Sequence, residues 1–150
     1  MQPRHASSAC LALLALLASP AAFAASGKPP KPVPPRDLRL ECRIRADGGA
    51  TTGKVRYEDR KGRRQLWATL EGPIGGDLAA GHVFDVVLAG VKAGQITLAI
   101  GASGKLEGAL RLDSKPVAGG TKAFPPGFPI LDAGAAAQIG SYGCTLQKGR

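Results

Sequence analysis

Hydrophobic and polar side chains alternate along residues 38–45, and this alternation constrains the fold more than any other feature of the chain. The apolar positions are Leu38, Leu40, Cys42 and Ile44, and the polar positions are Arg39, Glu41, Arg43 and Arg45. A period of two indicates a β-strand with one buried face, because successive side chains of a strand point to opposite sides of the sheet. The alternation recurs in residues 54–60 and 64–71. We therefore expect the folded part of the chain to begin with three half-buried strands.

Four further segments have strand character, namely residues 82–88, 91–100, 105–112 and about 138–146. Glycine turns separate most of them, and a long irregular segment occupies residues 113–134. Beyond residue 24 no window has the periodicity of a helix. The sequence therefore predicts an all-β fold in which residues 37–150 form one antiparallel β-sandwich of about seven strands, with a small β-barrel as the alternative.

The first 24 residues have the organisation of a secretory signal peptide. Arg4 precedes an apolar run at residues 10–18, and Ala22 and Ala24 supply the small residues of a cleavage site. The run is about half of the ~20 apolar residues that a membrane-spanning helix requires, so we expect cleavage after Ala24 and no transmembrane segment. Residues 25–36 contain five prolines and are predicted to form a stiff linker. We expect a periplasmic or secreted protein.

Two cysteines remain once Cys10 has left with the signal peptide. Cys42 shares a strand face with Leu40, and Cys144 shares one with Leu146, so both are expected to point into the core. Core-facing thiols of an exported protein usually pair. A Cys42–Cys144 disulfide would close a loop of about 100 residues, for which the chain-entropy model gives a stabilisation of ~4.7 kcal/mol. The alternative is two buried free thiols, and the spacing suggests neither a redox-active pair nor a metal site.

The motifs that suggest catalysis are incomplete in this chain. Residues 48–54 match the glycine and lysine spacing of a phosphate-binding loop, but Val55 stands in place of the required Ser or Thr and a strand follows. His82 is the one histidine outside the signal peptide, and Asp85 falls on the opposite face of its strand and cannot orient it. We therefore predict no catalytic residue, no metal site and no cofactor. The alternative is a small enzyme of unknown reaction that uses residues 113–134 as a lid.

Positive charge is concentrated in the first third of the folded part. The formal net charge is +9 at pH 7, and residues 28–64 carry twelve Lys or Arg against five Asp or Glu. If the first three strands form a meander, their polar sides combine into one basic face that also holds the only tryptophan. The candidate binding residues on this face are Arg39, Arg43, Arg45, Arg56, Arg63 and Trp67.

This basic face has two interpretations. An aromatic ring among guanidinium groups offers a stacking surface for an anionic glycan or lipid headgroup of the bacterial envelope. Alternatively, the face is a solvated set of salt bridges that prevents edge aggregation, with Trp67 covered by the loop of residues 72–81. Nucleic acid is not an expected partner, because the aromatic interleaving typical of single-strand binders is missing.

Three segments carry a pattern that the chain shares with other proteins. They are Lys-Val-Arg-Tyr-Glu at residues 54–58, the hairpin of residues 84–98 with its Asp85-Val86 and Gly94-Gln95-Ile96-Thr97-Leu98, and Leu-Arg-Leu-Asp at residues 110–113. In these segments the chain resembles a group of small exported bacterial β-domains, over most of residues 53–134. The resemblance implies the fold and export, and it implies no activity or site residue. The cysteine pair and the basic first strand lie outside the shared pattern.

Together these patterns predict an exported, non-enzymatic binding or structural module of the bacterial envelope. The expected partner is an anionic envelope polymer or another envelope protein. The alternative with a defined site is a binder of an anionic envelope glycan or lipid through the basic face around Trp67.

Overall fold

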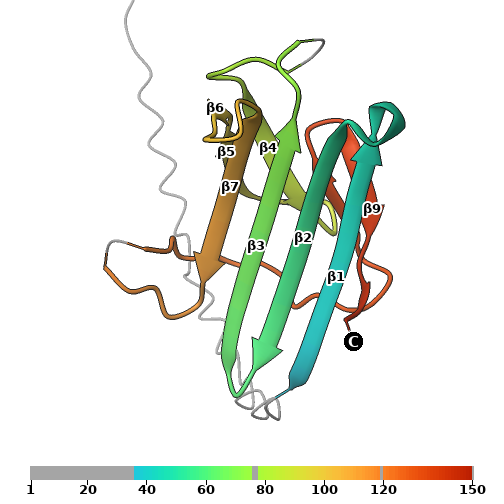
Figure 1. The fold of residues 1–150 in the computed structure, drawn as a ribbon. Helices are drawn as coiled ribbons and strands as arrows, with labels where there is room; N and C mark the ends of the chain where they lie inside the picture. The colour runs from blue at the N-terminus through green and yellow to red at the C-terminus, as the bar shows by residue number, and fades with distance from the viewer. Residues whose placement is uncertain (1–35, 76–77, 119, 150) are drawn as a thin grey trace, which may run out of the picture. The chain divides into compact units, whose positions relative to one another are not determined.

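Residues 36–75, 78–118 and 120–149 are described by the computed structural model, and they form two antiparallel sheets (Figure 1). One sheet has six strands in the order β10-β1-β2-β3-β7-β6, and the other has four in the order β5-β4-β8-β9. Neither sheet closes on itself, so the predicted β-sandwich is confirmed and the barrel alternative is not adopted. The predicted signal peptide and residues 25–35 of the predicted linker lie outside the described residues.

Three long strands form the centre of the larger sheet: β1 (Asp37–Ala46), β2 (Thr51–Arg60) and β3 (Arg63–Gly72). They pair as the predicted meander, with Cys42 opposite Val55 and Val55 opposite Ala68. Buried residues alternate with outward ones along most of the three strands, as the period of two requires, although at the end of β2 the outward Glu58 is buried as well. A short 3-10 turn, η1 (Asp47–Gly49), precedes β2, so a strand and not a helix follows the phosphate-loop match.

The chain crosses from one sheet to the other within the segment predicted as a single strand at residues 91–100. β4 (Val83–Leu88) and β5 (Val91–Thr97) form a hairpin of the smaller sheet. After the buried Leu98 the chain continues as β6 (Ala99–Ile100), which pairs with β7 (Leu106–Asp113) in the larger sheet. The predicted strand is therefore two strands, because the chain bends at a corner where it changes sheets.

The single strand predicted at residues 138–146 is wrong, because the chain reverses within it. β8 (Ala136–Ile139) and β9 (Tyr142–Thr145) form a hairpin through Gly140, whose φ of 60° lies in the left-handed region that favours glycine. β10 (Gln147–Lys148) then pairs with β1. A lone glycine was an ambiguous signal, since β5 and β7 also contain glycine without turning.

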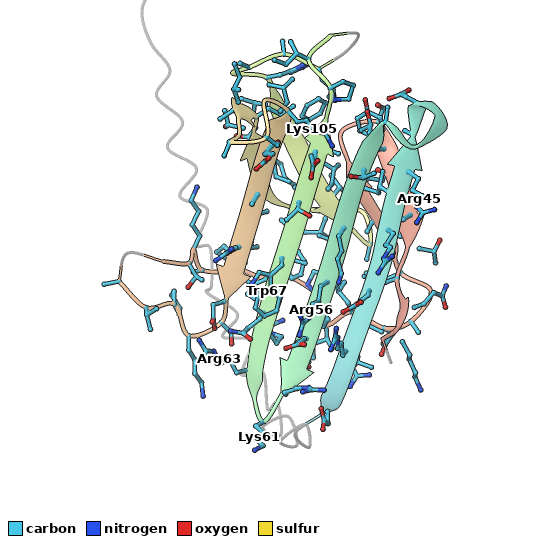
Figure 2. The ribbon with its side chains drawn as sticks, viewed as in Figure 1. Arg45, Arg56, Lys61, Arg63, Trp67 and Lys105 are labelled. Atoms are coloured by element: carbon cyan, nitrogen blue, oxygen red, sulfur yellow. A yellow bond between two sulfur atoms is a disulfide. The ribbon has the colours of Figure 1, made fainter. Side chains whose placement is uncertain are left out.

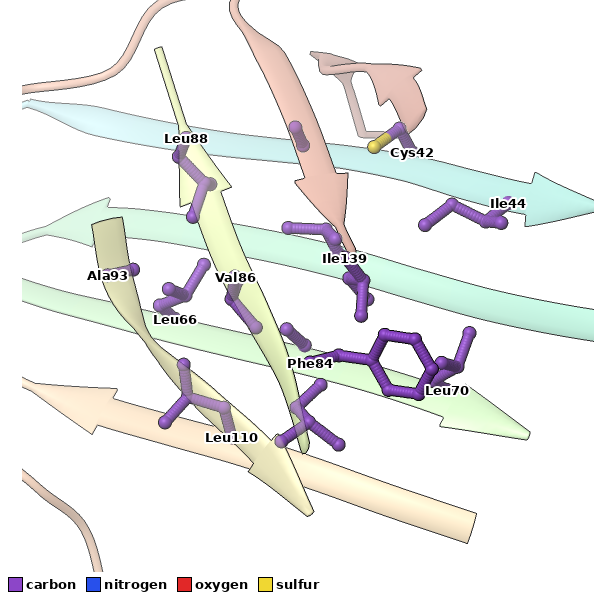
Figure 3. Packing of buried hydrophobic residues seen from close by; sticks show 14 of the residues in the cluster. Cys42, Ile44, Leu66, Leu70, Phe84, Val86, Leu88, Ala93, Leu110 and Ile139 are labelled. Carbon is purple, nitrogen blue, oxygen red and sulfur yellow. The ribbon is translucent and has the colours of Figure 1, made fainter. Parts of the chain in front are cut away.

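The core lies between the two sheets, and the Cys42 side chain belongs to it (Figure 3). Leu66 of the larger sheet and Leu88 and Ile139 of the smaller are fully buried. The Cys42–Cys144 bond, with Cα atoms 5.9 Å apart, joins β1 of the larger sheet to β9 of the smaller. The predicted pairing is confirmed, and it is a bond between the two sheets.

The long segment after β7 is anchored to the sandwich by its aromatic residues. Phe128 and Leu131 are buried in the core. Arg64 of β3 donates a hydrogen bond from Nη1 to the carbonyl oxygen of Phe128 at 3.1 Å, and its guanidinium carbon lies 5.3 Å from the centroid of the Phe124 ring. The segment predicted to be irregular thus contributes two side chains to the core.

Candidate functional site

The outer face of the larger sheet presents its side chains in rows that cross the strands, because antiparallel pairing places outward residues of neighbouring strands opposite each other (Figure 2). Each row takes one residue from each of β1, β2, β3 and β7. The Trp67 row is Glu41, Arg56, Trp67 and Arg111; the Thr69 row is Arg43, Lys54, Thr69 and Ala109; the Glu71 row is Arg45, Thr52, Glu71 and Glu107. The six predicted binding residues all lie on this face, but of them only Arg43 lines the groove described next, and Arg56 and Trp67 line a hollow beside it.

A groove of about 530 Å³ lies over the Thr69 and Glu71 rows. Its floor is low because Thr69 and Ala109 are short, whereas the Trp67 row beside them carries long side chains. Arg43 and Lys54 line it on β1 and β2, and Glu107 lines it on β7. The groove therefore runs across four strands instead of along one.

Trp67 stands at the edge of this groove. Its side chain is half-buried, and the guanidinium carbon of Arg56 lies 5.2 Å from the ring centroid, a cation–π contact between neighbouring strands. A hollow of about 180 Å³ beside the ring is lined by Lys54, Arg56, Trp67 and Thr69, and it shares Lys54 and Thr69 with the groove. Trp67 lies at mid-strand and the loop of residues 72–81 starts at the strand end, so Arg56 and not that loop is the neighbour at the ring.

Much of the positive charge around Trp67 is compensated. Arg39 donates a hydrogen bond to Glu41, and Arg56 donates one to Glu58. Lys54 Nζ lies 3.3 Å from Glu41 Oε2. The Arg39 hydrogen bond is the main reason why the pKa of Glu41 is lowered, and Lys54 adds to the effect. The prediction of a salt-bridged face is therefore right for these residues, although ion pairs that water still reaches contribute only about 1 kcal/mol or less each.

Arg63 lies away from the groove and forms an ion pair with Asp113 (Figure 2). Its Nε lies 3.0 Å from both carboxylate oxygens of Asp113, and its Nη2 lies 2.5 Å from Oδ2. Asp113 also accepts hydrogen bonds from the side chain of Gln65 and the backbone N–H of Lys115. These donors, Arg63 first, hold the pKa of the Asp113 carboxyl far below its ordinary value.

Arg43 and Arg45 are the uncompensated members of the predicted set. Both side chains are exposed, and within the described residues neither guanidinium has a carboxylate within the 4.0 Å of a salt bridge. Arg43 lines the groove directly, whereas Arg45, at the β1 end of the Glu71 row, does not line it. An anion can bind Arg43 without first displacing a carboxylate of the protein.

Sequence reasoning missed the β7 side of the groove. Glu107, Ala109 and Arg111 follow the period of two and were identifiable as outward residues. The pairing of β7 with β3 was not identifiable, because 33 residues containing two strands of the other sheet separate β3 from β7. Lys54, an outward residue in the sequence pattern, also belongs to the groove.

His82 and Asp85 have separate surroundings on the smaller sheet. Asp85 accepts a hydrogen bond from Gln95 at 2.9 Å and lies 2.7 Å from Lys92 Nζ, so its pKa is lowered chiefly by Lys92. The His82 ring packs against Phe84 with centroids 4.5 Å apart. Asp85 is thus a solvent-facing residue paired with a cation of the neighbouring strand.

The described residues contain no group of three or more His, Cys, Asp or Glu side chains placed to hold a metal ion. No helix in that part of the chain is long and apolar enough to cross a membrane. No protein-family model, curated protein or solved structure matches the chain.

Proposed function

We propose that the chain is an exported, non-enzymatic binding module of the bacterial envelope that holds an acidic glycan in the groove beside Trp67. The observation that carries the proposal is a groove of about 530 Å³, lined by the uncompensated Arg43, that shares Lys54 and Thr69 with the hollow beside the half-buried Trp67. The Cys42–Cys144 disulfide supports export, because such bonds persist in oxidising compartments.

The shape of the site favours a polymer over a small anion. The groove crosses β1, β2, β3 and β7, so an extended chain can contact all four strands at once. The Trp67 ring offers an apolar surface for a sugar ring, and its NH group can donate a hydrogen bond. The hydroxyl groups of Thr52 and Thr69 line the same groove and can pair with sugar hydroxyls.

The charges favour an acidic ligand at the β1 and β2 end. The guanidinium of Arg43 can bind a carboxylate or phosphate with two parallel hydrogen bonds. Lys54 lies beside it in the same row, and Glu41 partly compensates its charge, with Lys54 Nζ 3.3 Å from Glu41 Oε2. Binding at exposed cations weakens as salt screens their charge.

The test is the binding of the oxidised protein to hyaluronan, a polymer of alternating glucuronate and N-acetylglucosamine, at low and high salt. Trp67→Ala and Arg43→Glu should each weaken binding by about tenfold at low salt, the effect of losing a stacking contact or a charge-assisted hydrogen bond. Lys61→Glu is the matched control, because Lys61 is exposed at the β2–β3 turn away from the groove. Equal losses of affinity in Arg43→Glu and Lys61→Glu would show that binding depends on the net charge of the protein and not on the groove.

A further inference from the structure

The two ends of the groove carry opposite charge. On β1 and β2 it is lined by Arg43 and Lys54, with Arg45 in the adjoining position. On β3 and β7 it is lined by Glu71 and Glu107. The face is therefore not uniformly basic where a ligand would lie.

The Glu107 carboxylate is the charge at the acidic end without a direct ion pair, and Lys105 acts on it only at longer range. Glu71 is paired with Lys105, whose Nζ lies 2.9 Å from Oε1. Glu107 accepts a hydrogen bond from Ser103 Oγ at 2.8 Å, and within the described part of the chain no Lys or Arg nitrogen lies within 4.0 Å of its carboxylate. Gly101 lies against this carboxyl group, so a side chain at residue 101 would require the carboxyl group to move. The turn before β7 thus lies beside a carboxylate that no cation contacts directly.

The distance between the two charged ends is set by the sheet. Arg43 lies on β1 and Glu107 on β7, and the strands β2 and β3 lie between them. Three spacings of ~4.8 Å between neighbouring strands separate the two backbones by roughly 14 Å. This is far enough for a ligand to present different groups to the two ends.

We propose, building on the proposed function, that the glycan carries free ammonium groups as well as acidic groups, and that it lies with an acidic group at Arg43 and an ammonium at Glu107. An ammonium would give Glu107 the direct ion pair that it lacks. A purely acidic chain that spans the groove would instead bring negative charge against Glu71 and Glu107, and like charges at such a contact oppose binding. The structure therefore assigns a preference for amino sugars that are not N-acetylated.

The experiment compares hyaluronan with the same polymer after partial removal of its N-acetyl groups, which exposes primary amines without changing the glucuronates. The wild-type protein should bind the de-N-acetylated polymer about tenfold more tightly, the value of one charge-assisted hydrogen bond. Glu107→Gln keeps the shape and removes the charge, and it should reduce this preference to about twofold or less. Asp85→Asn is the matched control, because it neutralises an exposed carboxylate on the other sheet and should leave the preference unchanged.

The outcomes separate this inference from the function on which it rests. If neither polymer binds in a manner that depends on Trp67 and Arg43, the proposed function is overturned. If the wild-type protein binds both polymers equally, or if Glu107→Gln keeps the full preference, the assignment of an ammonium to Glu107 is overturned. The proposal that the groove binds an acidic glycan is then unaffected. A thermal melt of Glu107→Gln that matches the wild type ensures that the comparison is made between folded proteins.

Discussion

The outer faces of the two sheets differ in size and charge although their inner faces share one core. β1, β2 and β3 have ten residues each, so the larger sheet presents several complete rows of long side chains. β8 and β9 have four residues each, and among the described residues the smaller sheet carries one ion pair, Asp85–Lys92. Strand length thus gives the larger sheet the room for an extended ligand.

Two aspartates show what this difference means for stability. Asp113 of the larger sheet is buried and receives hydrogen bonds from Arg63, Gln65 and the Lys115 backbone. Asp85 of the smaller sheet is exposed, and water competes with its partners. The pKa of both carboxyls is lowered, yet only the buried one is expected to matter for folding.

The largest expected effect concerns the bond that joins the two sheets. Cys42→Ala/Cys144→Ala should lower the free energy of unfolding by about 4 kcal/mol, because the disulfide closes a long loop with a sequence separation of 102. Urea denaturation measures the loss, and the reduced wild-type protein should resemble the variant. Hydrogen exchange should rise most in β8 and β9, since the larger sheet keeps its ten-residue pairings. A uniform rise of hydrogen exchange over both sheets would contradict the proposal that the smaller sheet depends more on the disulfide.

The next effect concerns Asp113. Asp113→Asn should lower the free energy of unfolding at pH 7 by about 1–2 kcal/mol, because a charge-assisted network is lost while Arg63 stays partly solvated. A lowered pKa in the folded state means that the carboxylate stabilises the fold above its unfolded pKa of ~3.9. The difference between variant and wild type should therefore persist at pH 5–7 and shrink as the pH falls below about 3.9. Equal denaturation midpoints at pH 7 would contradict this role.

The sequence predicts the parts of the fold that depend on local alternation. Leu40, Cys42, Val55 and Leu66 are buried where the period of two places them. The corner at Leu98 was missed because Leu98 stays buried there, so the apolar pattern continues through the bend. The reversal at Gly140 was missed because one glycine at the turn does not distinguish a turn from a continuing strand.

The candidate site is predictable where it lies on strands that are consecutive in the sequence. Arg43, Arg56 and Trp67 were expected on one face because β1, β2 and β3 are consecutive. Glu107 was not, since its place beside Glu71 depends on a pairing between strands distant in the sequence. The distribution of charge into paired and unpaired arginines also depends on side-chain geometry, which the alternation of residue types does not specify.

The smallest expected effect concerns Asp85, and it tests whether the smaller sheet's outer face is only solvated. Asp85→Asn removes an exposed charge whose Lys92 and Gln95 partners are free to pair with water, so no resolvable change in the denaturation midpoint is expected at pH 7. The same titration series used for Asp113 provides the comparison, and the pH dependence of Asp85→Asn should follow that of the wild type. A loss as large as that of Asp113→Asn would mean that this face is held together by its ion pair. The contrast between a groove-bearing sheet and a merely solvated one would then have to be abandoned.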